Sequence, residues 1–393
     1  MIKKTEFMKK VRVYSFFGTA ILLLSVSLVS LVLSGCQNKN AGKSPGSVKT
    51  RTFKAGKKPR AIAVDASGNV WVANEGSNNI MKFSQKGVVI GTYNIENELK
   101  QVEKEQMAVV NGIGKGNFIG KIKASRIKAF SYPNVIVIGR SSGNVWVADR
   151  DGEFNIVKLS LSGAIEGKYN TAKWLNLNKL AGGGFMPLGM AIDASGNVWT
   201  ANGGSENVSK LNKNGSLIGS YKVGIMPGGI AIDASGNVWV TNYFSGNVYK
   251  LSPAGTVAGI YSVSRWGVKG IAIDPSGDVW VTGGRGVVKL NPSGEVIGNY
   301  KVSSPSSALD TAGRFAVAID TSGDVWTANG GGNTVTELNS KGAVLGIYKV
   351  GVSPEGIAID ASGDVWTANV GSNNITELIG AAKGPQYFAQ PAP

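Results

Sequence analysis

Gly229-Ile-Ala-Ile-Asp-Ala-Ser-Gly-Asn-Val-Trp239 is one of seven related copies of a phrase that recurs along this 393-residue chain. Each copy ends in a tryptophan, and the last five spacings between these tryptophans are 53, 40, 41, 46 and 40 residues. A period near 40 residues with four short apolar runs per copy is typical of a β-propeller in which each copy forms one blade. The seven tryptophans are Trp71, Trp146, Trp199, Trp239, Trp280, Trp326 and Trp366.

The copy at residues 229–263 predicts the four antiparallel strands of one blade. Residues 229–233 form the innermost strand A, 237–242 strand B, 246–252 strand C and 256–263 the outer strand D. These runs are rich in Val, Ile, Trp, Tyr and Thr and are bounded by Gly or Pro, as strands are. Strands A and B are apolar on both faces, which suits a sheet packed between two neighbouring sheets. We therefore expect each repeated tryptophan to pack between blades.

The ring is expected to close by strand exchange between its two ends. The last repeat, residues 356–379, contains strands A, B and C but no fourth strand. Near the other end, Thr52-Phe-Lys-Ala-Gly-Lys-Lys-Pro59 runs into Ile62-Ala-Val-Asp65 and aligns with Ser220-Tyr-Lys-Val-Gly-Ile-Met-Pro227, which runs into Ile230-Ala-Ile-Asp233. Residues near 48–55 should therefore complete blade seven. The alternative is an eight-bladed ring in which residues 94–130 form a degenerate blade without the repeated turn and tryptophan.

The propeller is assigned to residues 48–380, with an insertion at 94–132 and a C-terminal tail at 381–393. The insertion begins with an apolar stripe at helical spacing, which predicts a short amphipathic helix. A basic segment with interleaved apolar residues follows it and suggests a flap that faces a membrane or a partner. The alternative for this insertion is an extra β-hairpin packed over the propeller. The basic residues are Lys115, Lys121, Lys123, Arg126 and Lys128.

The N-terminus carries the features of an export signal. Five basic residues precede an apolar stretch from about Val13 to Leu33, and translation can start at Met1 or Met8. This pattern predicts a signal peptide over residues 1–35. The ending Leu33-Ser-Gly-Cys36 resembles the lipobox of bacterial lipoproteins, and Cys36 is the single cysteine of the chain. The resemblance implies lipidation of Cys36, and residues 36–47 then form a flexible tether.

Two readings of this N-terminus remain open. An uncleaved transmembrane anchor is the alternative to a lipoprotein signal, because about 20 apolar residues can span a bilayer. If the protein is a lipoprotein of a Gram-negative host, Gln37 rather than Asp after the lipidated cysteine resembles the outer-membrane sorting signal. The expected location is therefore the cell envelope.

The chain is basic, with 41 Lys and Arg against 25 Asp and Glu and a formal net charge of +16. An exported basic protein is expected to meet lipid head groups, cell-wall polymers, polysaccharides or acidic proteins, and nucleic acid is not an expected partner. The alternative is that these charges only keep a monomeric protein soluble.

Strand direction alternates within a blade, so the D–A and B–C loops share one face of the ring. The A–B turns hardly vary among the repeats, whereas the D–A connections differ in length. Variable loops on a rigid scaffold are common recognition sites. We therefore expect binding on the D–A/B–C face.

Two rings of residues are expected to border the central mouth on that face. The ring near the start of strand A carries three cations and one anion, which favours an anionic ligand. The ring at the end of strand B is mostly asparagine, and such asparagines can instead satisfy loop backbone. The first ring comprises Arg60, Asn134, Leu188, Gly228, Lys269, Arg314 and Glu355, and the second Asn74, Asp149, Asn202, Asn242, Gly283, Asn329 and Asn369.

The repeats resemble NHL-type propellers and the virginiamycin B lyase-like group, chiefly at 227–239 and 354–366. The resemblance implies a lyase that opens a cyclic depsipeptide lactone with a histidine base, a glutamate and Mg²⁺. This chain has no histidine, and strand B ends in Asn202 or Asn242 where that group commonly has glutamate. No catalytic residue of the group therefore has a counterpart here. Gluconolactonase-like propellers hold a divalent metal with Glu, Asn and Asp, which Asp149 with Asn74 and Asn202 could imitate.

The sequence leaves three candidate functions. The favoured one is a non-catalytic, membrane-anchored scaffold for a protein, peptide or anionic polymer, with no cofactor. The second is a metal-assisted lyase or lactone hydrolase at the mouth that uses Asp149 or Glu355 and a divalent metal. The third is a structural surface component without a dedicated ligand.

Overall fold

A computed structural model describes residues 48–95, 132–139, 142–150, 155–171, 186–264, 267–283, 286–302 and 316–387. The predicted signal peptide, Cys36, Gln37, the tether, most of the 94–132 insertion and Arg314 lie outside these residues. Within the described ranges, no helix has the length and apolar character needed to cross a bilayer.

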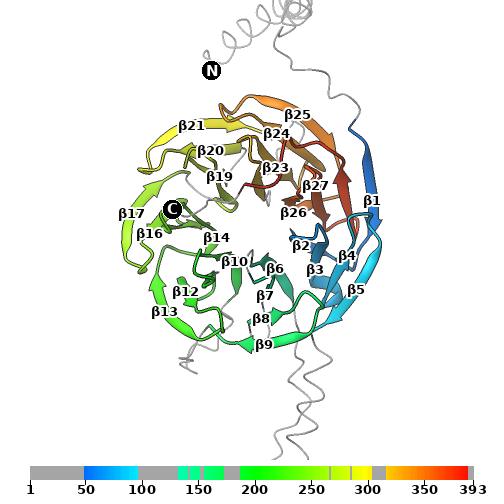
Figure 1. Cartoon of the computed structure of the whole chain (residues 1–393). Helices are drawn as coiled ribbons and strands as arrows, with labels where there is room; N and C mark the ends of the chain where they lie inside the picture. The colour runs from blue at the N-terminus through cyan, green and yellow to red at the C-terminus, as the bar shows by residue number, and fades with distance from the viewer. Residues whose placement is uncertain are drawn as a thin grey trace, which may run out of the picture. The chain divides into compact units, whose positions relative to one another are not determined.

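Seven sheets of four antiparallel strands form a closed ring (Figure 1), which confirms the seven-bladed propeller. The innermost strands, strand A of each blade, are β2 (Pro59–Val64), β6 (Pro133–Ile138), β10 (Pro187–Ile192), β14 (Pro227–Ile232), β18 (Ile271–Ile273), β22 (Val317–Ile319) and β26 (Pro354–Ile359). The second strands, strand B, are β3 (Val70–Asn74), β7 (Val145–Asp149), β11 (Val198–Asn202), β15 (Val238–Asn242), β19 (Val279–Gly283), β23 (Val325–Asn329) and β27 (Val365–Asn369).

The outer half of each blade consists of strands C and D. The C strands are β4 (Asn79–Phe83), β8 (Ile156–Leu159), β12 (Asn207–Leu211), β16 (Asn247–Leu251), β20 (Gly286–Leu290), β24 (Thr334–Leu338) and β28 (Asn374–Leu378). The D strands are β5 (Val89–Asn94), β9 (Ile165–Tyr169), β13 (Leu217–Lys222), β17 (Val257–Ser262), β21 (Val296–Lys301), β25 (Val344–Lys349) and, for blade seven, β1 (Thr50–Lys54).

The N-terminal strand closes the ring, as its sequence predicts. Strand β1 pairs antiparallel with β28, with Thr50 opposite Leu378 and Lys54 opposite Asn374. Phe53 stacks on Trp366 with ring centroids 5.9 Å apart. Two nitrogens of the Arg51 guanidinium each lie 2.6 Å from a carboxylate oxygen of Glu377. Blade seven is therefore built from both ends of the propeller.

Six of the seven repeated tryptophans are fixed by the aspartate of the preceding A–B turn, and Trp146 is the exception because blade two has Gly139 at that position. In blade four, Trp239 Nε1 donates to Asp233 Oδ2 at 3.0 Å. The other carboxylate oxygen accepts the backbone N–H groups of Ser235 and Asn237. Gly236 in this turn has φ +81°, which an L side chain rarely adopts. The buried ring of Trp239 packs against Ile271 and other apolar residues of blade five, so the tryptophans do pack between blades.

A lysine on strand C and a tyrosine on strand D complete this contact between blades. Lys250 Nζ lies 4.7 Å above the Trp239 ring and donates to the carbonyl of Pro292 in blade five. Tyr261 stacks on the same tryptophan at 5.6 Å. The lysine recurs in blades one to five, whereas Glu337 and Glu377 take its place in blades six and seven.

Asp65, the turn aspartate of blade one, should make the stability of the protein depend on pH in the acid range. Burial by itself raises the pKa of Asp65, but hydrogen bonds from Trp71 and Asn69 and the charge of Lys82 outweigh it and leave the pKa below 3.8. A lowered pKa contributes stability above the unfolded value, and this contribution is lost as pH falls through the folded pKa. The free energy of unfolding of wild type, measured with denaturant, should therefore fall below about pH 4. In Asp65→Asn the free energy of unfolding should depend less on pH in this range. An equal pH dependence in the two proteins would contradict the role given to Asp65.

Candidate functional site: the channel mouth

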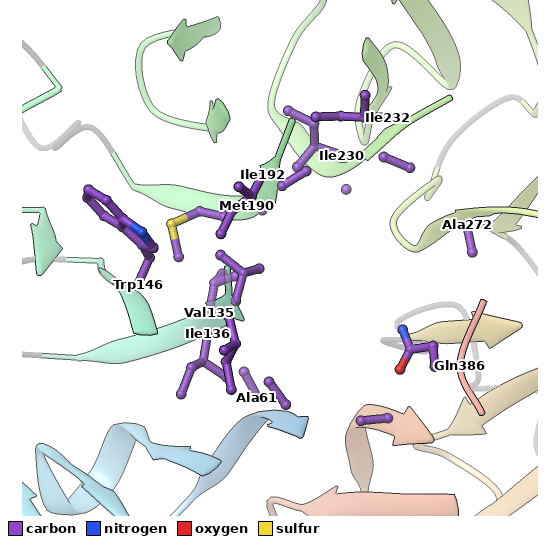
Figure 2. A pocket seen from close by; sticks show the side chains of 18 of the residues that line it. Ala61, Val135, Ile136, Trp146, Met190, Ile192, Ile230, Ile232, Ala272 and Gln386 are labelled. Atoms are coloured by element: carbon purple, nitrogen blue, oxygen red, sulfur yellow. The ribbon is translucent and has the colours of Figure 1, made fainter. Parts of the chain in front are cut away.

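The seven innermost strands surround a central cavity of about 950 Å³. Its wall is apolar because strand A presents isoleucine, valine or methionine to the channel in every blade. Figure 2 shows Ile136, Met190 and Ile230 along this wall. We call the end bordered by the D–A and B–C loops the channel mouth. Arg60, Asn134 and Glu355 line the cavity at the mouth, whereas Asp193, Lys213 and Asp233 line it at the opposite end, beside the A–B turns.

Arg60 is held at the mouth by two carboxylates. Its Nε donates to Glu75, which follows strand β3, and one terminal nitrogen lies 2.5 Å from Glu355 Oε2. Arg150 reaches the other oxygen of Glu75 at 3.5 Å. The cluster therefore links blades one, two and seven. Two carboxylates already neutralise the Arg60 guanidinium, which disfavours the binding of an anionic ligand to it.

Lys269 is the other described cation of the strand-A ring. Its Nζ lies 4.8 Å above the ring of Tyr243. Burial lowers the pKa of Lys269, and the nearby negative charge of Glu355 opposes this shift. The structure thus brings Arg60, Glu355 and Lys269 into one electrostatic group.

Arg314, the third cation predicted for this ring, stands at a different spacing from its turn aspartate than the other two cations. Arg60, Lys269 and Glu355 each stand five residues before the aspartate of their A–B turn. Arg314 stands six residues before Asp320, so the equivalent position is 315. Both positions lie outside the described residues.

The residues of the predicted strand-B ring lie at the ends of the B strands, as expected, but their side chains do not border the mouth. Asn202 Nδ2 donates to Asn207 Oδ1 at 2.8 Å and to Ser209 Oγ at 2.9 Å. Asp149 accepts the backbone N–H of Tyr132 at 2.6 Å. The Asn202 contacts join strand B to strand C, and the Asp149 contact joins the end of strand B to the residue before strand A of the same blade. Polar groups such as these need hydrogen-bond partners once they are buried. The buried members are Asn74, Asp149, Asn202, Asn242, Asn329 and Asn369.

The sequence analysis missed the position directly after strand B. Glu75, Arg150 and Tyr243 occupy it in blades one, two and four, and all three contact residues of the mouth or its rim. Their signal was the chemical variation at one position of an otherwise uniform repeat. The predicted ring used the last residue of strand B, which is one residue before this position.

An aromatic patch lies beside the mouth, and we define it as Ile225, Tyr243, Phe244 and Lys269. Tyr243 and Phe244 meet edge to face with centroids 5.0 Å apart. The N–H of Phe244 donates to the carbonyl of Ile225 at 3.4 Å. Phe244 is 57% exposed and Ile225 is 52% exposed. In four other blades the position of Phe244 is a glycine, namely Gly76, Gly204, Gly331 and Gly371.

The metal chemistry implied by the family resemblance does not fit these residues. The chain has no histidine. Among the residues that the structure describes, no group of three or more His, Cys, Asp or Glu side chains could hold a metal ion. Asn74 and Asn202, which could have joined Asp149 in an oxygen-rich site, are buried in their own corner contacts.

Comparison with known proteins agrees with the fold. The solved structures most like this chain include a streptogramin B lyase, 17% identical with a TM-score of 0.65 over 84% of this chain and 96% of the other. Virginiamycin B lyase of Staphylococcus aureus has the same identity and TM-score and is covered to 99%, against 84% of this chain. A catalytically inactive His-to-Ala variant of that enzyme with quinupristin is 18% identical, with a TM-score of 0.64 and coverages of 84% and 99%.

These identities show a shared fold. No curated protein matches the chain. The model of the virginiamycin B lyase family matches residues 105–378, which is more than half of the sequence. The chain therefore belongs to the virginiamycin B lyase family.

Proposed function

We propose that this protein is an exported, lipid-anchored propeller that binds a protein, peptide or anionic polymer on its D–A/B–C face without catalysing a reaction. The observation that carries the proposal is the exposed Phe244 at a position where four other blades have glycine. Phe244 projects from the B–C loop and contributes no core packing that those blades lack.

The aromatic patch has the composition of a binding hot spot. Aromatic side chains offer about 150–250 Å² of apolar surface each and are enriched where binding energy is concentrated. Tyr243 holds Phe244 edge to face, so little side-chain freedom is lost on binding. Lys269 stacks on Tyr243 and adds a positive charge suited to an acidic partner. The loop backbone bond between Phe244 and Ile225 keeps the two apolar side chains adjacent.

The contacts of the two candidate catalytic carboxylates, Glu355 and Asp149, argue against catalysis. Glu355 is paired with Arg60, and Asp149 is buried and accepts a backbone hydrogen bond. A general base must reach the proton that it removes. The His-to-Ala variant of the S. aureus enzyme is described as inactive, and this chain has no histidine at any position. The metal-assisted alternative lacks a comparable supporting observation.

Export and anchoring through Cys36 are part of the proposal and rest on the N-terminal sequence. Cys36 precedes strand β1 by 14 residues, so a lipidated cysteine would tether the propeller closely to a bilayer. The partner would then be an envelope component. The net positive charge favours an acidic one.

The test compares wild type with Phe244→Gly, which restores the residue found in four other blades. Material retained from native envelope extract by each full-length protein would be quantified by mass spectrometry. The amount of a specific partner retained by Phe244→Gly should be at least about tenfold lower than with wild type, because truncating a hot-spot side chain typically costs about 2 kcal/mol or more of binding free energy. Ile218→Ser is the matched control, since it removes a similarly exposed apolar side chain from outer strand β13.

Two results would overturn this function. Equal retention of every partner by wild type and Phe244→Gly would remove the aromatic patch from the proposal. Opening of the quinupristin lactone by purified wild type, with or without Mg²⁺, would show that the protein is an enzyme.

A further inference from the structure

The C-terminal tail is partly built into the propeller. We define residues 380–387 as the strap. It leaves blade seven after β28, passes beneath the A–B turns of blades seven and six, and ends at the channel. Figure 2 shows Gln386 beside the cavity, and both Gln386 and Tyr387 line it. The strap therefore lies at the end of the channel opposite the mouth.

The strap is bound by its backbone. Ala382 N donates to the carbonyl of Gly363 at 2.9 Å in the blade-seven turn. Thr321 N donates to the carbonyl of Pro385 at 2.9 Å, and Gln386 forms an antiparallel bridge with Asp320. Strand β22 is the innermost strand of its sheet, so its free edge faces the channel. The strap adds to that edge in the manner of a peptide that extends a sheet.

Lys383 supplies a charge that blade six lacks. In blade five, Lys289 Nζ lies 3.4 Å from Asp274 and 2.8 Å from Asp278. The equivalent pair in blade six is Asp320 and Asp324, but the strand-C lysine is replaced by Glu337.

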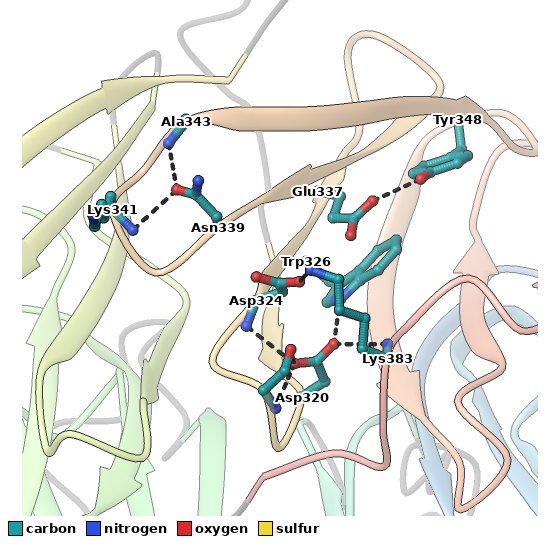
Figure 3. Close-up of polar contacts among 10 residues, drawn as sticks. Asp320, Asp324, Trp326, Glu337, Asn339, Lys341, Ala343, Tyr348 and Lys383 are labelled. Carbon is teal, nitrogen blue, oxygen red and sulfur yellow. Dashed lines mark hydrogen bonds and ion pairs between the residues drawn. The ribbon is translucent and has the colours of Figure 1, made fainter. Parts of the chain in front are cut away.

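The strap brings the missing cation from outside the blade. Figure 3 shows Lys383 beside the two aspartates. Its Nζ lies 2.5 Å from Asp324 Oδ2, and its backbone N–H donates to Asp320 Oδ2 at 3.2 Å. Glu337 turns to Tyr348, whose hydroxyl donates to it at 2.6 Å. Blade six therefore presents two buried carboxylates to a lysine that arrives on another segment.

The end of the strap is recognised by side chain and backbone together. Gln386 Oε1 accepts the N–H of Ile359 in strand β26 at 3.1 Å. Tyr387 N donates to the carbonyl of Ile319, and its ring packs on the cluster around Trp280. Lys383, Gln386 and Tyr387 thus each contact a different part of the propeller: the aspartates of blade six, strand β26 and the cluster around Trp280.

We propose that the underside of blades six and seven is a peptide-binding site for an extended segment with a lysine three residues before a glutamine, and that the strap is its displaceable resident. Main-chain bonds provide affinity for such a segment and side-chain pockets provide selectivity. The Lys383 side chain is 60% exposed, so a competing segment can reach the pair that it forms.

The test uses a labelled synthetic peptide with the sequence of residues 380–393. It should bind saturably to a chain that ends at Ile379 and show little binding to the full chain, where the strap competes at high effective concentration. A peptide carrying Lys383→Glu should bind at least about tenfold more weakly, because it loses a charge-assisted hydrogen bond and places like charges together.

A second variant guards against misfolding of the truncated chain. Lys383→Glu in the full chain should release the strap and allow the wild-type peptide to bind. Lys341→Glu makes the same charge change on the exposed C–D turn of blade six and should leave the site closed.

Two outcomes overturn the proposal. One is absence of peptide binding to both the Lys383→Glu chain and a folded truncated chain. The other is equal peptide binding to wild type and the Lys383→Glu chain.

Discussion

Deletion of residues 48–56 is expected to abolish cooperative folding of the propeller. The deletion removes β1 and leaves blade seven with three strands. It also leaves the buried Glu377 carboxylate without Arg51, and a buried acceptor that loses its partner costs about 1–3 kcal/mol. The lost ladder bonds add roughly 0.5–1.5 kcal/mol each, and Trp366 loses its stacking on Phe53. The sum approaches the roughly 5–15 kcal/mol that stabilises a typical domain.

The measurement is thermal unfolding followed by circular dichroism and by tryptophan fluorescence. Deletion of residues 1–46, which leaves the compact unit Ser47–Pro393 intact, is the control and should melt like the parent chain. An unchanged melting temperature after removal of 48–56 would refute closure by β1. Arg51→Ala should lie between the two deletions, because burial raises the pKa of Glu377 and the Arg51 contact opposes that shift.

Trp280→Ala is expected to destabilise the propeller more than Trp280→Phe does. Trp280 is fully buried, and its Nε1 donates to Asp274 Oδ2 at 2.9 Å. Truncation of a buried tryptophan costs about 3–5 kcal/mol through lost transfer energy and a cavity. It also removes the partner of a buried carboxylate and the ring beneath Lys289, so we expect the upper end of that range.

Trp280→Phe separates the two contributions. It keeps an aromatic ring between the blades but loses the N–H, so it should cost about 1–3 kcal/mol by leaving Asp274 short of a donor. Phe244→Ala is the control, because an exposed side chain outside the core should change stability by less than about 0.5 kcal/mol. Urea unfolding at pH 7 measures all three. Equal stability of Trp280→Ala and Phe244→Ala would contradict the role given to the repeated tryptophan.

The fold could be predicted because its determinants are local and repeated. The turn aspartate and the tryptophan stand six residues apart in each regular copy, and the same hydrogen bond joins them, as between Asp360 and Trp366. The closing strand was also predictable, since Phe53 occupies the position that a tyrosine fills in the other D strands. The strap was not predictable from such rules. The run Gly380-Ala-Ala-Lys-Gly-Pro-Gln-Tyr387 lacks strand alternation, and its conformation is fixed by backbone groups of blades six and seven and by carboxylates of blade six.

The candidate site was predicted in outline only. Position within the repeat correctly placed Arg60 and Glu355 at the mouth, but their pairing joins residues 295 positions apart. Nothing in the local sequence of Arg60 indicates that Glu75 and Glu355 will neutralise it. The strand-B asparagines show the opposite problem. Their position was right, but whether an amide faces a channel or a corner depends on side-chain direction, which periodicity alone does not fix.

The closing strand also sets the order in which the molecule can be completed during synthesis. Arg51 is among the first propeller residues made, yet Glu377 follows it by 326 residues. At about 5–20 residues per second, β1 waits tens of seconds for its partner to be translated. A nascent or prematurely terminated chain would keep an open seam with unpaired strand edges, which chaperones and proteases can recognise. Blade seven can therefore be completed only after the chain has been translated as far as β28.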